Sequence, residues 1–292
     1  MVDFLQAVAA GISSGCIYGL VAIGVVLIYK ATEVVNFAQG ELMMIGAFLA
    51  FTFIVLTGLP YWVAFILMVA LMALFGMGLD RILIRPLVGY PTFSIVMVTI
   101  GFGILARSIV SVIPGWGTET YGFHTPFVDQ YTKLGKLVLS NEQLAVIGIA
   151  LILIIGLFCF FRFTRIGVAM QAVSENQLAA TYMGISVKSV FSLIWALSAA
   201  VAGFAGILLA PITFVHVNMG FLGLKAFPAA VLGGLSSVPG AIVGGLVIGI
   251  TESLAGLYLP IGWKDMAAYI ILILVLIIRP EGIFGNKERK KV

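Results

Sequence analysis

Side chains that could bind a polar solute are few in this chain, and they stand beside long apolar runs. Shortly after Lys30 the sequence places Asn36, Gln39 and Glu41 close together. Amide and ionisable groups are costly inside a membrane and tend to be functional where they occur there. Two interpretations of this stretch stay open. It is a cytoplasmic turn, or it is a broken helix that dips into the protein with these side chains facing a polar path.

Three further polar side chains belong to the same hypothesis. His216 and Asn218 fall near a predicted outer interface, and Glu252 ends a glycine-rich run, where it could sit at an outer mouth. A lone histidine is more typical of a hydrogen-bonded interface residue than of a ligand. The predicted substrate path is therefore lined by Asn36, Gln39, Glu41, His216, Asn218 and Glu252.

No pattern in the sequence indicates catalysis or a bound cofactor. Cys16 and Cys159 both fall inside apolar runs and have no partner at metal or redox spacing. Gly135-Lys136 is followed by Leu137, without the upstream glycine or the following Ser or Thr of a phosphate-binding loop. We expect the chain to be no enzyme and to bind neither metal nor cofactor, so any ATP hydrolysis must come from another protein.

The composition places the chain in a lipid bilayer. Hydrophobic residues make up 62% of it and charged residues only 10%, against roughly 45–50% and about 25% in soluble domains. The net charge of +4 is small for 292 residues and concentrated in loops and at the tail. Binding to nucleic acid is therefore not indicated.

Apolar runs predict the membrane spans. The first, Gln6–Tyr29, is long enough to cross a hydrocarbon core of about 30 Å. Two later pieces, 225–235 and 238–251, are interrupted at 233–240 and are too short to cross as separate helices, so they predict a re-entrant hairpin. The other predicted spans are 42–57, 61–79, 92–114, 144–161, 190–210 and 265–278. We expect a single domain (1–292) with an all-α, polytopic bundle of about seven to eight spans.

Glycines recur at four-residue spacing in two of these segments. Such spacing forms a seam along which a neighbouring helix can approach closely, and it is more typical of helix packing than of transport chemistry. The predicted packing residues are Gly11, Gly15, Gly19, Gly240, Gly244, Gly245 and Gly249. Broken helices like the 225–251 hairpin are, in contrast, where transporters commonly place substrate paths.

The distribution of positive charge predicts the orientation. Most of the sixteen Lys and Arg residues fall on one side if the N-terminus is outside, and that side is then cytoplasmic. This places the loop 162–189 and the basic tail 279–292 inside, the tail against membrane lipid. The loop 115–143 lies outside, as a surface for a binding protein or as a plain solvated loop. The hairpin would then enter and leave on the outer side.

Two groups of charged residues remain. Asp80, Arg81 and Arg85 mark an inner loop after the third span. Arg107 is left within a span, where it could pair inside the bundle, line a pore or snorkel to the interface. Snorkelling is the default expectation for a long cationic side chain.

The loop 162–189 has folding signals of its own. Ser174-Glu175-Asn176-Gln177 has the form of a capping box, in which the serine accepts from an early helix amide and the glutamine reaches back to another. Gly184 can end that helix in a left-handed conformation. The sequence thus predicts one helix of about ten residues between them.

The predicted helix carries an apolar ridge. Leu178 and Tyr182, and likewise Ala179 and Met183, are four residues apart and fall on one face. A short, capped helix with an exposed apolar face between spans is an interaction element. Its predicted contact residues are Ser174, Glu175, Gln177, Leu178, Ala179, Ala180, Tyr182, Met183 and Gly184.

Three stretches of sequence resemble one known family. Residues 178–184 (LAATYMG) are similar to the EAA-x-x-x-G loop of ABC importer permeases, and 171–187 resembles its version in branched-chain amino acid (LivH-type) permeases. Residues 35–47, and 223–234 followed by 239–245, resemble two further motifs of that family. Leu178 stands where the broader pattern has glutamate, which puts in doubt any contact that needs that charge but leaves the apolar ridge intact.

The resemblance implies a function and a set of partners. The chain would be one of two permease subunits in the cytoplasmic (inner) membrane of a bacterium or archaeon. It would work with a sister (LivM-type) permease, two ATP-binding subunits that use ATP and Mg²⁺, and a periplasmic or lipid-anchored solute-binding protein. Leucine, isoleucine, valine, other amino acids, amides and urea stay open as substrates.

The main alternative is a self-sufficient secondary transporter or channel for a small polar solute. Paired ionisable residues deep in the spans and an inverted repeat would favour it. A membrane enzyme would need a convergent acid, base or metal set, and the sequence shows none.

Overall fold

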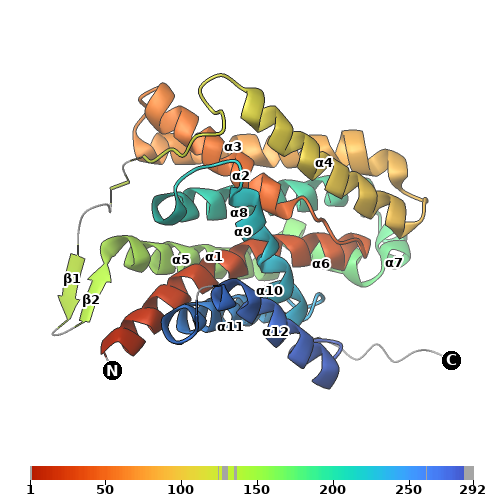
Figure 1. Cartoon of the computed structure of the whole chain (residues 1–292). Coiled ribbons are helices and arrows are strands. Elements are labelled where there is room, and N and C mark those ends of the chain that lie inside the picture. Colours follow the sequence, from red (N-terminus) through yellow and green to blue (C-terminus); the bar gives the residue numbers. More distant parts are fainter. Residues whose placement is uncertain (1, 124, 127–130, 135–136, 261, 286–292) are drawn as a thin grey trace.

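The structure, a computed structural model, describes residues 2–123, 125–126, 131–134, 137–260 and 262–285. It is a helical bundle with one small β-hairpin (Figure 1). Parts of the predicted outer loop (124, 127–130 and 135–136) and most of the basic tail (286–292) lie outside the described residues.

Most of the helices follow one another with short connections, and the longest connection, between α4 and α5, contains the β-hairpin. In chain order they are α1 (Val2–Thr32), α2 (Gln39–Phe51), α3 (Tyr61–Leu79), α4 (Thr92–Val112), α5 (Asn141–Phe163), α6 (Arg165–Glu175), α7 (Gln177–Tyr182), α8 (Val187–Thr213), α9 (Met219–Leu224), α10 (Ala226–Gly233), α11 (Val238–Tyr258) and α12 (Trp263–Ile278). A π-helical turn (Thr52–Leu56) extends α2, and a π-helical turn (Asp80–Ile84) and a 3₁₀ turn (Arg85–Leu87) extend α3. The strands β1 (Tyr131–Leu134) and β2 (Leu137–Ser140) pair antiparallel.

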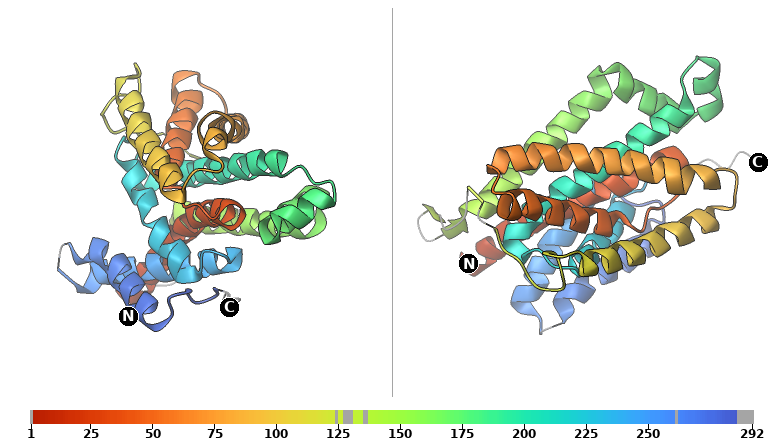
Figure 2. Two further views of the ribbon diagram at one scale, coloured as in Figure 1. Left: turned by 90° about the vertical axis from the view of Figure 1, so that its right-hand side faces the viewer. Right: turned by 90° about the horizontal axis from the view of Figure 1, so that it is seen from above.

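Among the described residues, seven helical segments are long and apolar enough to cross a membrane, which confirms the predicted polytopic bundle. They include α11, predicted as an arm of the hairpin, but not the 16-residue α12, which was predicted as a span. α1 and α8 are almost entirely enclosed by the rest of the chain, whereas α3, α4 and α5 expose most of their surface. α1, red in Figure 2, runs through the middle of the bundle. The β-hairpin and α7 lie at opposite ends of it (Figure 1).

The predicted glycine seams belong to two helix contacts. Gly11, Gly15 and Gly19 of α1 pack on α11, where Gly245 and Gly249 touch the α1 backbone. A β-carbon on Gly15 would lie 2.8 Å from the Cα of Leu246, so no larger residue fits. The two other seam glycines, Gly240 and Gly244, pack on α10 instead.

The segment predicted as a re-entrant hairpin is built differently. Its first arm is short, as expected, because it consists of α9 and α10. Its second arm, α11, has 21 residues and is long enough to span. The turn between the arms lies near the C-terminal end of α1, since Ser236, Ser237 and Lys30 line one cavity with Ser174.

The structure corrects the depth of this hairpin: its turn reaches the end of the bundle at which α1 ends, so the second arm crosses the bundle, and the predicted entry and exit on the outer side stay a prediction. Helix α11 continues through Glu252, and that carboxylate is neutralised inside the protein by Lys225, 2.6 Å away. One arm runs toward the cytoplasmic end and the other returns. The predicted orientation of the remaining spans is unchanged.

Replacement of Gly15 by leucine is expected to destabilise the fold. The side chain would collide with the α11 backbone, and overpacking of this kind costs about 1–3 kcal/mol or more. We expect a lower melting temperature in detergent and less monodisperse protein on gel filtration. Gly148→Leu is the matched control, because a β-carbon at Gly148 meets nothing within 4 Å. Equal behaviour of the two variants would refute the close contact.

Candidate functional site

The loop between α5 and α8 forms two short helices, not the single one predicted. Helix α6 starts at Thr164, whose side chain accepts from the Gly167 amide at 3.0 Å, and it runs on through Ser174. The Ser174 hydroxyl donates to the Met170 carbonyl at 2.8 Å. The capping box centred on Ser174 is thus wrong, because α6 already includes that residue.

Helix α7 has its own caps. The Asn176 side chain accepts from the Ala179 amide at 2.9 Å, so Asn176 is the N-cap. Gly184 takes a left-handed conformation (φ +81°), and the Ile185 amide donates to the Ala180 carbonyl at 3.0 Å. The chain turns at Gly184, as the sequence indicated.

The apolar ridge of α7 points away from the bundle. Leu178 is 71% exposed, Tyr182 87% and Met183 81%. Ala179 is also exposed, whereas Ala180 is buried on the opposite side. An exposed apolar patch at the end of a helical bundle marks a surface for another molecule.

Two contacts attach the α6–α7 corner to the end of α1. The Gln177 side chain donates to the Ala31 carbonyl at 3.1 Å, in place of the predicted capping contact. Glu175 and Lys30 form an ion pair at 3.3 Å. Movement of α7 would therefore pull on the central helix of the bundle.

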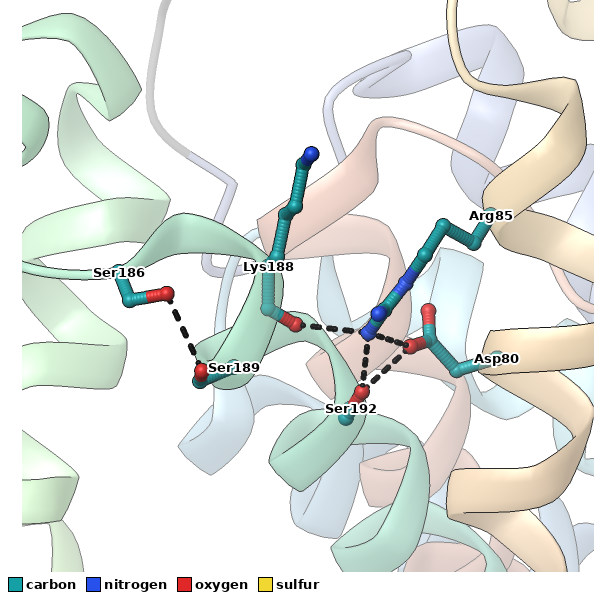
Figure 3. Close-up of polar contacts among 6 residues, drawn as sticks. All are labelled: Asp80, Arg85, Ser186, Lys188, Ser189 and Ser192. Carbon is teal, nitrogen blue, oxygen red and sulfur yellow. Dashed lines mark hydrogen bonds and ion pairs between the residues drawn. The ribbon is translucent and has the colours of Figure 1, made fainter.

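A third attachment joins the start of α8 to the end of α3 (Figure 3). Buried Asp80 accepts from Arg85 at 2.9 Å and from the Ser192 hydroxyl at 2.6 Å. Arg85 also donates to Ser192 at 2.6 Å and to the Lys188 carbonyl at 3.2 Å. We call Asp80, Arg85 and Ser192 the clamp.

Sequence reasoning found only part of this clamp. It placed Asp80 and Arg85 in an inner loop, and the structure shows them in the turns that extend α3. Ser192 carries no signal of its own, because its partner Asp80 is 112 positions away in the chain.

Inside the bundle, the chain between α1 and α2 enters the protein as a break between helices. Asn36 and Gln39 are both buried, and the Asn36 side chain donates to that of Gln39 at 3.1 Å. Gln39 in turn donates to the Ser198 carbonyl of α8 at 3.2 Å and lies against Gly24 of α1. Of the two interpretations of this stretch, the broken helix is therefore the one that the structure shows.

Glu41 and Arg107 form an ion pair between α2 and α4. The Arg107 guanidinium also lies 3.8 Å from the ring centroid of Phe221 in α9. Snorkelling of Arg107 to the interface is therefore the wrong expectation. The arginine stays in the bundle because α2 brings a carboxylate within its reach.

Glu252, predicted near an outer mouth, is enclosed by its neighbours and not open to solvent. It is buried in α11, where Lys225, at the junction of α9 and α10, bonds to Glu252 at 2.6 Å and to Asp265 of α12 at 2.7 Å. His216 is half-buried and Asn218 exposed in the connection from α8 to α9. Of the six predicted path residues, the structure gathers Asn36, Gln39 and Glu41 at the start of α2.

Known proteins resemble this chain over nearly its whole length. The family profile described as "Branched-chain amino acid transport system / permease component" matches residues 7–276. The high-affinity branched-chain amino acid transport system permease protein LivH of Escherichia coli (strain K12) is 32% identical over 301 residues, which cover 99% of this chain and 98% of that protein. The corresponding protein BraD of Pseudomonas aeruginosa has the same identity and coverage.

A more distant relative and a solved structure agree with this. The probable branched-chain amino acid transport permease protein LivH of Methanocaldococcus jannaschii is 30% identical over 288 residues, covering 93% of this chain and 89% of that protein. The solved structure "PsaBC from Streptococcus pneumoniae in complex with Fab" superposes with a TM-score of 0.52 over 97% of this chain and 94% of that one. At 15% identity it supports the fold alone. The chain belongs to the family of permease components of branched-chain amino acid transport systems.

Proposed function

We propose that this chain is a permease subunit of an ATP-driven importer for branched-chain or related amino acids in the cytoplasmic membrane. In this proposal α7 is the helix on which a separate ATP-binding subunit docks. The observation that carries the proposal is the exposed ridge of Leu178, Tyr182 and Met183 on a helix with defined caps at both ends. Family membership, through relatives described as branched-chain amino acid permeases, supports the substrate class.

The ridge suits a protein groove better than water. Fully burying a large apolar side chain contributes about 1.5–3 kcal/mol, so docking of this ridge would supply a useful part of the binding free energy. An amphipathic helix seated in an apolar groove is a recurring mode of recognition. The missing carboxylate at Leu178 does not weaken this contact, because the contact is apolar.

The attachments of α7 explain how docking could move the spans. Gln177 and Glu175 connect the α6–α7 corner to α1, and the clamp connects the start of α8 to α3. A rigid displacement of α7 would therefore reach three spans, two of which form the enclosed centre of the bundle. Packed helices shift as units between discrete arrangements, which is what alternating access requires.

The remaining partners follow from the proposed role. We expect a sister permease, two ATP-binding subunits and a solute-binding protein outside. ATP and Mg²⁺ would be bound by the ATP-binding subunits, and this chain would perform no hydrolysis itself.

A self-sufficient secondary transporter remains the second candidate, and one observation favours it. The spans contain the buried ion pairs Glu41–Arg107 and Lys225–Glu252, which ion-coupled transporters commonly use. Such a transporter, however, has no need of an exposed apolar helix at its cytoplasmic end. The importer explains both features.

Tyr182→Arg is expected to release the ATP-binding subunit. A charge in the centre of an apolar contact must be desolvated, and we expect co-purification from native membranes to fall at least tenfold, which corresponds to about 1.4 kcal/mol. Thr181→Arg adds the same charge to the same helix outside the ridge and should have a smaller effect. Retention of the ATP-binding subunit by Tyr182→Arg would refute the docking site. Solute uptake by vesicles that contain this chain alone would instead support the secondary transporter.

Ser192→Ala is expected to weaken coupling without releasing the ATP-binding subunit. It removes a hydroxyl that bonds to both Asp80 and Arg85, and a hydrogen bond to a charged group contributes about 1.5–3 kcal/mol. We expect a several-fold fall in amino acid taken up per ATP hydrolysed by the complex in proteoliposomes. Ser189→Ala is the matched control, because that hydroxyl contacts Ser186 outside the clamp (Figure 3). The clamp has no role in coupling if the two variants behave alike.

A further inference from the structure

The ion pair of Glu41 and Arg107 lies where three segments cross inside the bundle. Helix α2 begins at Gln39, against the middle of the enclosed helices α1 and α8. In the same first turn the backbone of Gly40 contacts Gly220 and Gly223 of α9. Arg107 reaches this crossing from α4.

The backbone of two glycines packs against the Glu41 carboxylate. A β-carbon at Gly103 of α4 would lie 3.4 Å from a carboxylate oxygen of Glu41, and one at Gly220 of α9 would lie 3.0 Å from the other. Gly103 lies about one helical turn before Arg107 in α4. Gly220 is next to Phe221, whose ring contacts the Arg107 guanidinium. The pair is thus bordered by the backbone of two glycines and by one aromatic ring.

The arginine side of the pair faces the outside of this subunit. The Arg107 side chain is 24% exposed, whereas that of Glu41 is buried. Phe221 of α9 is also exposed, and so is Ile104, which lies on the turn of α4 before Arg107. A partly uncovered guanidinium within a span cannot face hydrocarbon without a large cost, so water or protein must cover this face. The buried Nε of Arg107 has no hydrogen-bond partner among the described residues, so the guanidinium is not fully satisfied.

We propose that the Glu41–Arg107 pair binds the two charged groups of a zwitterionic α-amino acid in transit, and that the face of α4 at Ile104 lines the water-filled path. The carboxylate of the amino acid would bind Arg107 and its ammonium group Glu41. This inference rests on the proposed function and names the residues that would recognise its substrate class.

Charge balance favours a zwitterion over other solutes. Breaking a buried ion pair is strongly destabilising because each partner is left uncompensated. A ligand with one positive and one negative group can replace both partners at once, whereas a simple amine or carboxylate leaves one of them unpaired. Phe221, beside the guanidinium, offers an apolar surface to the ligand's side chain.

The path is tested by the reactivity of an introduced cysteine. In a Cys16→Ala/Cys159→Ala background, Ile104→Cys is compared with Ile152→Cys of α5, an isoleucine in the middle of a span with similar exposure (66% and 72%). The assembled transporter is treated with a membrane-impermeant, charged methanethiosulfonate, which reacts with thiolates in water. We expect modification of Ile104→Cys at least tenfold faster. Equally slow modification at both positions would overturn the path.

The pair itself is tested by exchanging its charges. Glu41→Gln and Arg107→Gln should each lower the melting temperature and the uptake rate. The double exchange Glu41→Arg/Arg107→Glu restores an ion pair, so its melting temperature should recover, but the zwitterion now meets the wrong charge at each end. We expect uptake to stay below about a tenth of wild type. Recovery of uptake together with stability would show a purely structural pair and overturn the proposal.

If the double variant Glu41→Arg/Arg107→Glu does not fold, a conservative single variant tests the proposal instead. Arg107→Lys keeps the charge opposite Glu41 but loses the planar fork that binds a carboxylate through two hydrogen bonds. We expect at least a fivefold lower uptake rate with the ATP-binding subunits still bound, and an unchanged rate would overturn the proposal.

The wild-type complex separates the two levels of inference. If it imports amino acids while these variants behave as a structural pair predicts, only the zwitterion site fails. If the complex with its ATP-binding subunits and binding protein imports no amino acid, the proposed function fails and the site falls with it.

Discussion

Backbone polar groups that leave a helix inside a membrane must find partners within the protein, because lipid offers none. This constraint governs the break between α1 and α2. The Asn36 side chain accepts from the Ala38 amide at 3.0 Å, and the Phe37 amide donates to the Thr99 hydroxyl of α4 at 3.3 Å. Gln39 extends the network to α8. The polar residues of this stretch thus hold an interrupted helix in place and bring its first turn to the centre of the bundle.

The same requirement explains the charged residues of the later half. The helix is interrupted again between α9 and α10, and Lys225 at that junction is neutralised by carboxylates of α11 and α12. The two interrupted segments meet where Gly40 contacts Gly220 and Gly223. Contacts of this closeness need a residue without a bulky side chain, such as glycine. Polar groups, glycines and helix breaks therefore occur together for one reason, and the proposed substrate path lies where they meet.

The end of the bundle that carries α7 follows the opposite principle. There the apolar side chains of α7 are exposed to water, while polar contacts attach the helix to the bundle behind it. A surface of this kind is stable in an assembly that covers it. Its attachments reach α1 and, through the clamp on α8, also α3, so docking at one end and the polar crossing in the interior are joined by the enclosed helices.

Apolar run length and glycine spacing determined six of the seven spans, the membrane location and the helix-packing residues, since both patterns are local. The turn at Gly184 and the exposed ridge of α7 were also readable, because they depend on residues four or fewer positions apart. The partners of Arg107, Glu252 and Ser192 were decided by tertiary structure alone. Their contacts join helices 27 to 112 positions apart in the chain, and no local pattern records which helices become neighbours. For the same reason Ser174 could not be placed: a capping box describes a helix start only if no earlier helix already includes it.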